Sequence, residues 1–106
     1  MNKNLISTEL KLPCGVVLKN RLVKSAMTER ISNKRFEPTK RHIRLYQDWA
    51  DTNSGLLITG NVMIDRKHCE SSGNVCFDDE AMVPILEKWA NSAKKNGSHI
   101  WVQISH

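Results

Sequence analysis

Three short polar segments follow apolar stretches of this sequence, and their residue types suggest a binding site. They contain a hydroxyl at Thr28, a residue without a side chain at Gly60 and a carboxamide at Gln103. Ligands of parallel α/β folds bind at the carboxyl ends of the strands, so neighbouring strands would bring these residues to one rim. Such groups suit a flat, neutral ring edged with heteroatoms better than a phosphate or a metal ion. Singly, each residue has a plain structural interpretation as a turn or strand end, and only their common placement favours a ligand site.

The elements that must position these residues alternate between strand and helix. Apolar residues are consecutive from Leu56 to Ile58, which indicates a strand covered on both faces. Apolar positions repeat at helical spacing after Thr39 and after Asp78 or Asp79, each of which can cap a helix. We predict a hairpin at 10–12 and 16–18, strands at 22–26, 55–60 and 99–104, and helices at 40–52 and from 78 or 79 to about 96. The segments 27–38 and 65–77 are predicted to be loops.

This order predicts an α/β fold in which right-handed βαβ units form a parallel sheet. Two helices that join three consecutive strands cover only one face of that sheet, whereas a parallel sheet needs both faces covered. We therefore expect residues 1–106 to be the first part of a larger single domain that continues after the third strand.

Composition narrows the classes of function. The chain has 106 residues, of which 40% are hydrophobic, as in one small globular domain. Its formal charge is +5, but no aromatic residues interleave with the basic cluster at 34–44, so we expect no nucleic-acid partner. The longest apolar run is far shorter than the ~20 residues of a membrane span. Without an apolar leader, the three cysteines are expected to be reduced thiols of a cytoplasmic protein.

Metal and nucleotide motifs find little support. Six residues separate Cys69 from Cys76, whereas zinc sites usually pair cysteines about two to four residues apart, and neighbouring His68 and Asp78 do not change that spacing. No G-x-G-x-x-G or P-loop pattern occurs. His106 has no visible acidic partner and is not expected to act as a base. We therefore predict no metal site.

Several stretches resemble the Old Yellow Enzyme family of FMN-dependent NADH:flavin oxidoreductases and ene-reductases. They are LKNRLVKSAMT at 18–28, GLLITGNVM at 55–63 and WVQISH at 101–106, joined by Pro38 and Thr39 with His42 and Tyr46 on the following helix. The motifs occur in the family's order from about residue 10 to residue 106.

The resemblance implies a (β/α)8 TIM barrel, with FMN over its C-terminal rim and the hairpin at its bottom. It places Ala26 and Met27 along the flavin, the Thr28 hydroxyl near the ring carbonyl at C4, and Gly60 and Gln103 at the pyrimidine edge. The implied reaction is reduction of FMN by NAD(P)H, followed by hydride transfer to a small-molecule acceptor, an electron-poor alkene.

Such a barrel needs ~250 residues. The resemblance puts the substrate-binding histidine pair, the proton-donating tyrosine and the phosphate-binding loops downstream of residue 106. We expect no catalytic residue in this chain and weak or no binding of FMN by the chain alone. The alternative is a non-catalytic partial barrel that assembles with itself or with another chain. Open strand edges at 22–26 and 100–104 favour self-association under either interpretation.

Overall fold

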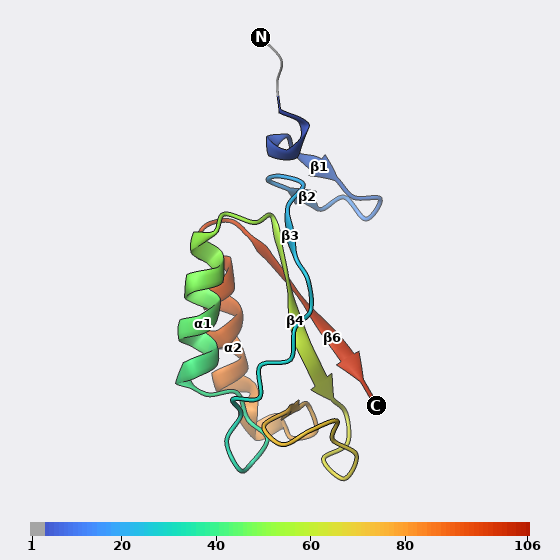
Figure 1. Ribbon diagram of the computed structural model, residues 1–106, viewed down its shortest axis with the longest axis vertical. Coiled ribbons are helices and arrows are strands. Elements are labelled where there is room, and N and C mark those ends of the chain that lie inside the picture. Colours follow the sequence, from blue (N-terminus) through green and yellow to red (C-terminus); the bar gives the residue numbers. More distant parts are fainter. Residues whose placement is uncertain (1–3) are drawn as a thin grey trace.

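The computed structural model describes residues 4–106, and its elements confirm the alternating order of strands and helices (Figure 1). A 3-10 turn, Leu5–Ser7, precedes the hairpin of β1 (Leu10–Lys11) and β2 (Val17–Leu18). The main layer contains β3 (Val23–Lys24), α1 (Lys40–Asp51), β4 (Leu56–Met63), β5 (Val75–Cys76), α2 (Val83–Lys94) and β6 (His99–Ser105). A second 3-10 turn, Glu80–Met82, leads directly into α2.

Strand β4 is the centre of a parallel sheet. Strand β6 pairs with one edge of β4 from its first residue, Leu56, to its last, Met63. Because that edge is taken, β3 and β5 share the other edge, with β3 beside the start of β4 and β5 beside its end. The parallel order β3-β4-β6 confirms the prediction. Strand β5 lies in a segment predicted to be a loop, because a two-residue strand becomes regular only through its pairing with β4.

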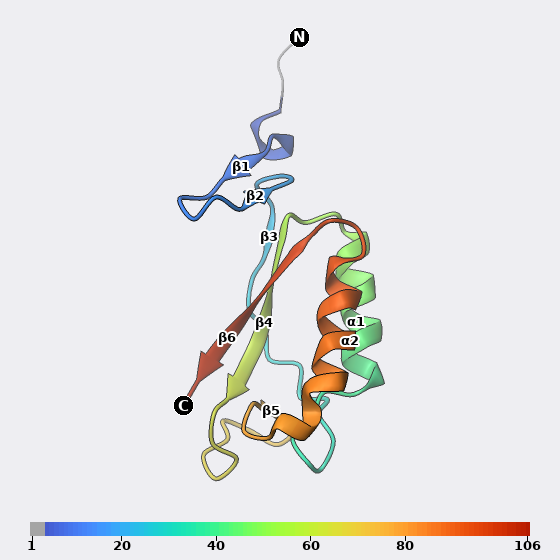
Figure 2. The same cartoon turned by 180° about the vertical axis from the view of Figure 1, so that it is seen from behind.

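Both helices pack on the same face of this sheet (Figures 1 and 2). The buried core joins Tyr46 of α1, Leu57 and Val62 of β4, and Trp89 and Ala93 of α2. The Tyr46 and Trp89 rings meet edge to face with their centroids 5.4 Å apart. The opposite face of the sheet carries no helix among residues 4–106, as the two predicted crossovers require.

The helix boundaries follow from their caps. Thr39 begins α1 with a capping box, in which its hydroxyl accepts from the Arg41 N–H at 3.2 Å and its own N–H donates to His42 Nδ1 at 3.0 Å. Asp79, one of the two predicted caps of the second helix, does cap the first helical turn, but this turn is 3-10 and the α-helix begins only at Val83. Pro84 has no N–H to donate to the carbonyl of residue 80, so a 3-10 turn capped by Asp79 precedes the α-helix. Within the described residues, neither helix is long and apolar enough to cross a membrane.

The hairpin lies beyond the amino-terminal ends of β4 and β6 (Figure 1), which is the end where the resemblance places it. Gly15 adopts φ +94° in its turn, a conformation that glycine enters without steric cost. Strand β3 ends at Lys24, two residues earlier than predicted, because the chain leaves the β4 edge before β5 begins to pair there.

Candidate functional site

A line of polar side chains crosses the carboxyl-terminal half of the main strands. Asn61 Nδ2 donates to one carboxylate oxygen of Glu70 at 2.8 Å, and the Thr28 hydroxyl donates to the other at 3.4 Å. Gln103 Nε2 donates to Asn61 Oδ1 at 2.5 Å. We call Thr28, Asn61, Glu70 and Gln103 the polar network. It links two predicted site residues, Thr28 and Gln103, that lie far apart in the sequence.

The strand register decides which way the polar network faces. Asn61 of β4 lies directly beside Gln103 of β6. Side chains alternate along a strand, and Val62 points into the core under the helices. Asn61 and Gln103 therefore project from the helix-free face of the sheet. In a closed barrel of parallel strands, that face is the inside.

A β-bulge in β4 sets this register. The ladder pairs Ile58 with Trp101 and then Asn61 with Gln103, so two residues of β4 oppose one residue of β6. The buried hydroxyl of Thr59 accepts from the Gln103 N–H at 3.1 Å and so replaces the missing ladder bond. Bulges of this kind redirect side chains next to functional sites.

Gly60 lies inside β4 at this bulge, not at the end of the strand as predicted, and the backbone of another segment touches it there. A Cβ at this position would meet the carbonyl oxygen of Met27 and lie 2.6 Å from Glu29 Oε1. The Gly60 N–H donates to Glu29 Oε2 at 3.3 Å, and the Tyr46 hydroxyl donates to the same oxygen at 2.5 Å. Glu29 thus ties the 27–29 segment to both β4 and α1. Sequence reasoning did not single out Glu29, because its two partners are distant in the sequence.

Burial shifts the pKa values of two side chains on the helix side of this segment, Tyr46 and Lys24. Burial and the hydrogen bond to Glu29 raise the pKa of Tyr46 far above its usual range, so the phenol remains a neutral donor. Burial lowers the pKa of Lys24, and the nearby Glu29 charge opposes this shift. Lys24 Nζ lies 5.3 Å from the Tyr46 ring centroid and 5.5 Å from that of Trp49, and it has no hydrogen-bond partner among residues 4–106. These groups support the 27–29 segment from its helix side.

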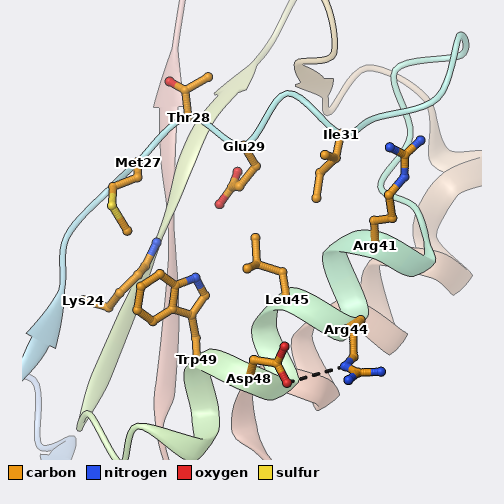
Figure 3. Close-up of a pocket in the computed structure, with 10 residues that line it drawn as sticks. All are labelled: Lys24, Met27, Thr28, Glu29, Ile31, Arg41, Arg44, Leu45, Asp48 and Trp49. Carbon is orange, nitrogen blue, oxygen red and sulfur yellow. Dashed lines mark ion pairs between the residues drawn. The ribbon is translucent and has the colours of Figure 1, made fainter.

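A hollow of about 540 Å³ opens between residues 24–31 and α1 (Figure 3). Met27 and Thr28 line it from above, and Leu45 and Trp49 line it from the helix. No residue of β4 or β6 contributes to its wall. This hollow therefore lies on the helix side of the segment, and Thr28 both lines it and belongs to the polar network.

The hollow beside α1 is lined by two of the five residues predicted to contact a flavin, Met27 and Thr28. Thr28 and Gln103 belong to the polar network, whereas Met27 and Gly60 are joined through a close backbone approach. Ala26 is half-buried just before this segment, and the Met27 side chain is exposed. Asn61 and Glu70 were not predicted. Asn61 directly follows Gly60 and had a local signal, but no local pattern marks Glu70.

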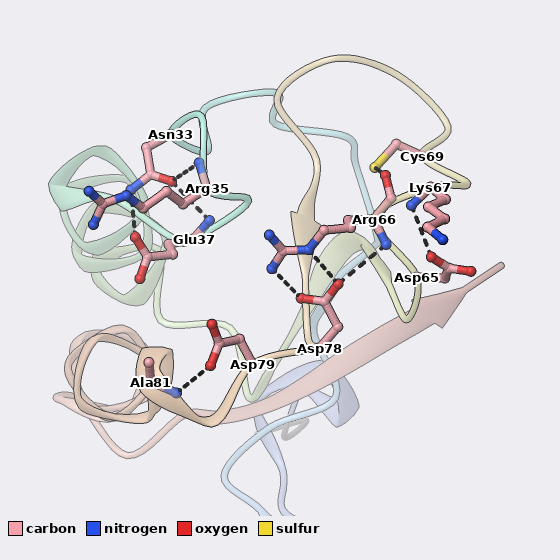
Figure 4. Close-up of polar contacts among 10 residues, drawn as sticks. All are labelled: Asn33, Arg35, Glu37, Asp65, Arg66, Lys67, Cys69, Asp78, Asp79 and Ala81. Carbon is pink, nitrogen blue, oxygen red and sulfur yellow. Dashed lines mark hydrogen bonds and ion pairs between the residues drawn. The ribbon is translucent and has the colours of Figure 1, made fainter.

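The loop that supplies Glu70 is anchored at its start by an ion pair (Figure 4). Arg66 makes a two-pronged ion pair with Asp78, with distances of 2.8 and 2.7 Å. The Arg66 guanidinium holds the pKa of Asp78 far below its usual range. Burial raises the pKa of Cys76 to about 12, so this residue remains a thiol near neutral pH. The three cysteines are all unpaired in the structure. The ion pair fixes the start of the loop to the segment that follows β5.

Comparisons with known proteins find flavin oxidoreductases, both in the family models and among individual proteins. The model of the family described as NADH:flavin oxidoreductase / NADH oxidase matches residues 10–106. The NADH-dependent flavin oxidoreductase iliE of Hypocrea jecorina is 34% identical over 104 residues, which cover 94% of this chain and 26% of that protein. The NADH-dependent flavin oxidoreductase nadA of Aspergillus parasiticus is 36% identical over 99 residues, 82% of this chain and 22% of that protein.

Solved structures agree with this match. The Old Yellow Enzyme of Pichia sp. AKU4542 superposes with a TM-score of 0.82 at 26% identity, covering 94% of this chain and 26% of that one. The old yellow enzyme of Trypanosoma cruzi superposes with a TM-score of 0.86 at 21% identity, covering 96% of this chain and 27% of that one. The expected likeness to the amino-terminal part of the family's barrel is thereby confirmed. The chain spans about a quarter of the length of these relatives.

Proposed function

This chain belongs to the NADH:flavin oxidoreductase / NADH oxidase family, and from that membership we propose that it forms one edge of the flavin site of an FMN-dependent oxidoreductase. NAD(P)H is the proposed reductant, and an electron-poor alkene is the proposed class of acceptor. When bound, FMN supplies hydride-transfer chemistry. The part of the site within residues 4–106 would bind the ring system of FMN and not its phosphate.

The polar network is the observation that carries this proposal. It gathers neutral donors and acceptors at one edge of the helix-free sheet face, where a barrel of this class places its ligand. The charged group of the polar network is the Glu70 carboxylate, which already accepts hydrogen bonds from Asn61 and Thr28. A site of this composition fits the uncharged, amide-like edge of a flavin ring and offers little to an isolated phosphate.

Each residue has a distinct proposed role. The Asn61 side chain and the backbone contact with Thr59 orient Gln103, so its carboxamide is held ready to bond the pyrimidine edge. The contact of Thr28 with Glu70 is long at 3.4 Å, so its hydroxyl can turn toward a ring carbonyl and stabilise negative charge there. Gly60 would contact the pyrimidine edge through its backbone, since the space beside its Cα is taken by the Met27 carbonyl. Met27, whose side chain is exposed, and Ala26 would cover the ring face.

A flavin titration of the chain tests the proposal. Binding is followed by the quenching of flavin fluorescence. Because the proposed contacts are to the ring, we expect the dissociation constants of FMN and riboflavin to lie within about twofold of each other. Gln103→Ala should weaken binding of both flavins by about tenfold, which corresponds to the loss of one hydrogen bond worth about 1.4 kcal/mol. Gln47→Ala is the matched control, since Gln47 lies on α1 away from the sheet face.

Two results would overturn the proposal. One is binding of FMN that is more than about tenfold tighter than binding of riboflavin, which would place the main contacts at the phosphate and not at the ring. The other is an unchanged affinity in folded Gln103→Ala protein. The alternative function as a non-catalytic interaction module receives no support from the family match, because the relatives found are named as flavin oxidoreductases.

A further inference from the structure

Two histidines and an aspartate meet beside the polar network. Ligating atoms of Asp65, His68 and His106 all lie within 4.8 Å of one another. His68 Nδ1 is 3.0 Å from Asp65 Oδ2, and the two imidazole centroids are 5.4 Å apart. His68 and His106 also line a separate hollow of about 470 Å³, together with Cys69 and Glu70.

The fold brings these residues together because they follow two paired strands. Asp65 and His68 begin the loop after β4, and His106 comes directly after β6. The last residues of those strands, Met63 and Ser105, are neighbours in the ladder. No sequence spacing signals this meeting, because the two segments are far apart along the chain.

The loop that carries Asp65 and His68 is held in place before any ligand arrives. Asp65 Oδ1 accepts from the Lys67 N–H at 2.9 Å, a turn drawn in Figure 4. Arg66, between the two loop ligands, is fixed by its ion pair with Asp78. The side chains of His68 and Asp65 are 63% and 39% exposed, so an ion can reach them from solvent.

We propose that Asp65, His68 and His106 bind a divalent transition-metal ion of the zinc class. Two imidazoles and one carboxylate are the mixed nitrogen and oxygen donors that Zn²⁺ and Co²⁺ accept, with a further position left for water. Metal–ligand bonds of about 2.1 Å hold tetrahedral ligands about 3.3 Å apart. The present separations, 3.0 Å between Asp65 and His68 and at most 4.8 Å over the three residues, lie on both sides of that spacing, so side-chain rotation would complete the site. The metal proposal does not rest on the proposed flavin function.

Binding of the metal ion would connect the loop after β4 to the end of β6. The backbone from Asp65 to His68 contains Arg66 and Lys67, which are both sites of trypsin cleavage. A metal ion held by Asp65 and His68 on one side and His106 on the other should close this segment to the protease. Cys69 lines the same hollow, so its thiol must be tested as a competing ligand.

Calorimetry with ZnCl₂, supported by Co²⁺ absorption spectra, tests the site on tag-free chain. A short Gly-Ser extension after His106 keeps the terminal carboxylate away from the cluster. We expect one ion per chain with a Kd of about 10 μM or tighter. Asp65→Asn, His68→Ala and His106→Ala should each weaken binding by at least about tenfold. Zn²⁺ should slow trypsin cleavage after Arg66 and Lys67 in the unsubstituted chain and not in His106→Ala.

Matched controls make the result decisive. His99→Ala removes a histidine from the other end of the same strand, and its affinity should equal that of the unsubstituted chain. Circular dichroism confirms that each variant is folded. The proposal is overturned if the folded chain shows no saturable binding, if His99→Ala loses as much affinity as His106→Ala, or if Cys69→Ser abolishes binding while the histidine variants retain it.

Discussion

At the scale of single residues, His42 has two linked roles at the start of α1. Its Nδ1 accepts the Thr39 N–H at 3.0 Å, the place that glutamate or glutamine holds in most capping boxes. Its ring is 1% exposed and lies 4.9 Å from the Trp89 centroid. Burial, followed by the nearby Arg41 charge, lowers the pKa of His42 to about 4. The folded chain therefore requires a neutral imidazole here.

This requirement makes stability depend on pH in a defined direction. The unfolded chain binds a proton at His42 near pH 6.5, whereas the folded chain does so only near pH 4. The contribution is thus complete above pH 6.5 and is lost as the pH falls toward 4, with a total of up to ~3 kcal/mol. His42→Gln keeps an acceptor for Thr39 but removes the titration. Urea unfolding from pH 7.5 to 5 should show a smaller loss of stability in His42→Gln, and parallel pH profiles would contradict this assignment.

At the scale of elements, the bulge in β4 contacts both the 27–29 segment and strand β6. Its extra residue brings Gly60 against the 27–29 segment, and the Thr59 hydroxyl completes the ladder to β6. The 27–29 segment is therefore held by packing against Gly60 and by the hydrogen bonds of Thr28 and Glu29, not by strand pairing. A change at the bulge should affect both the packing and the polar network.

Gly60→Ala tests this dependence. The added methyl group meets the Met27 carbonyl, which cannot rotate away as a side chain would, so we expect a loss of about 1–3 kcal/mol in unfolding free energy. Gly15→Ala is the control, because it places its methyl group in open space and carries only the backbone cost of φ +94°, about 1 kcal/mol. Chemical denaturation of both variants gives the comparison. A Gly60→Ala protein as stable as the unsubstituted chain would show that the contact is not tight.

At the scale of the whole molecule, the sheet has two open edges among the described residues. Strand β6 pairs only with β4, and β3 likewise has β4 as its one partner. Trp101, Val102 and Ile104 of β6 are 48%, 40% and 64% exposed. Unpaired edges with exposed apolar side chains attract further strands. We therefore expect the 106-residue chain to associate with itself as its concentration rises.

A charge on the β6 edge should reduce this association. Ile104→Lys places an ammonium group beside the open edge, where strand addition would bury it. Val83→Lys is the matched control, because Val83 is a similarly exposed apolar residue at the start of α2. Sedimentation velocity over a concentration series should show less association for Ile104→Lys only. Equal association of all three proteins would place the contact elsewhere on the molecule.

Local sequence determined most of the regular structure. Consecutive apolar residues identify β4, periodic apolar positions identify both helices, and Thr39 marks the start of α1 within one residue. These features are visible because strand and helix periods are properties of neighbouring residues. The motif at 18–28 and its two companions also led to the family, which the comparisons confirm. The assignment of Ala26, Met27, Thr28, Gly60 and Gln103 to a flavin remains a prediction.

Only the tertiary structure decided how distant segments meet. Glu70 reaches Thr28 and His106 reaches His68 because parallel strands place their carboxyl ends side by side. Glu29 reaches Tyr46 because α1 packs on the sheet. The two-residue strand β5 and the bulge before Asn61 exist through pairing across the sheet, not through local preference. Such contacts depend on register, and a shift of one residue would turn each side chain to the other face. A linear pattern does not fix that register, so it emerges only when the sheet is assembled.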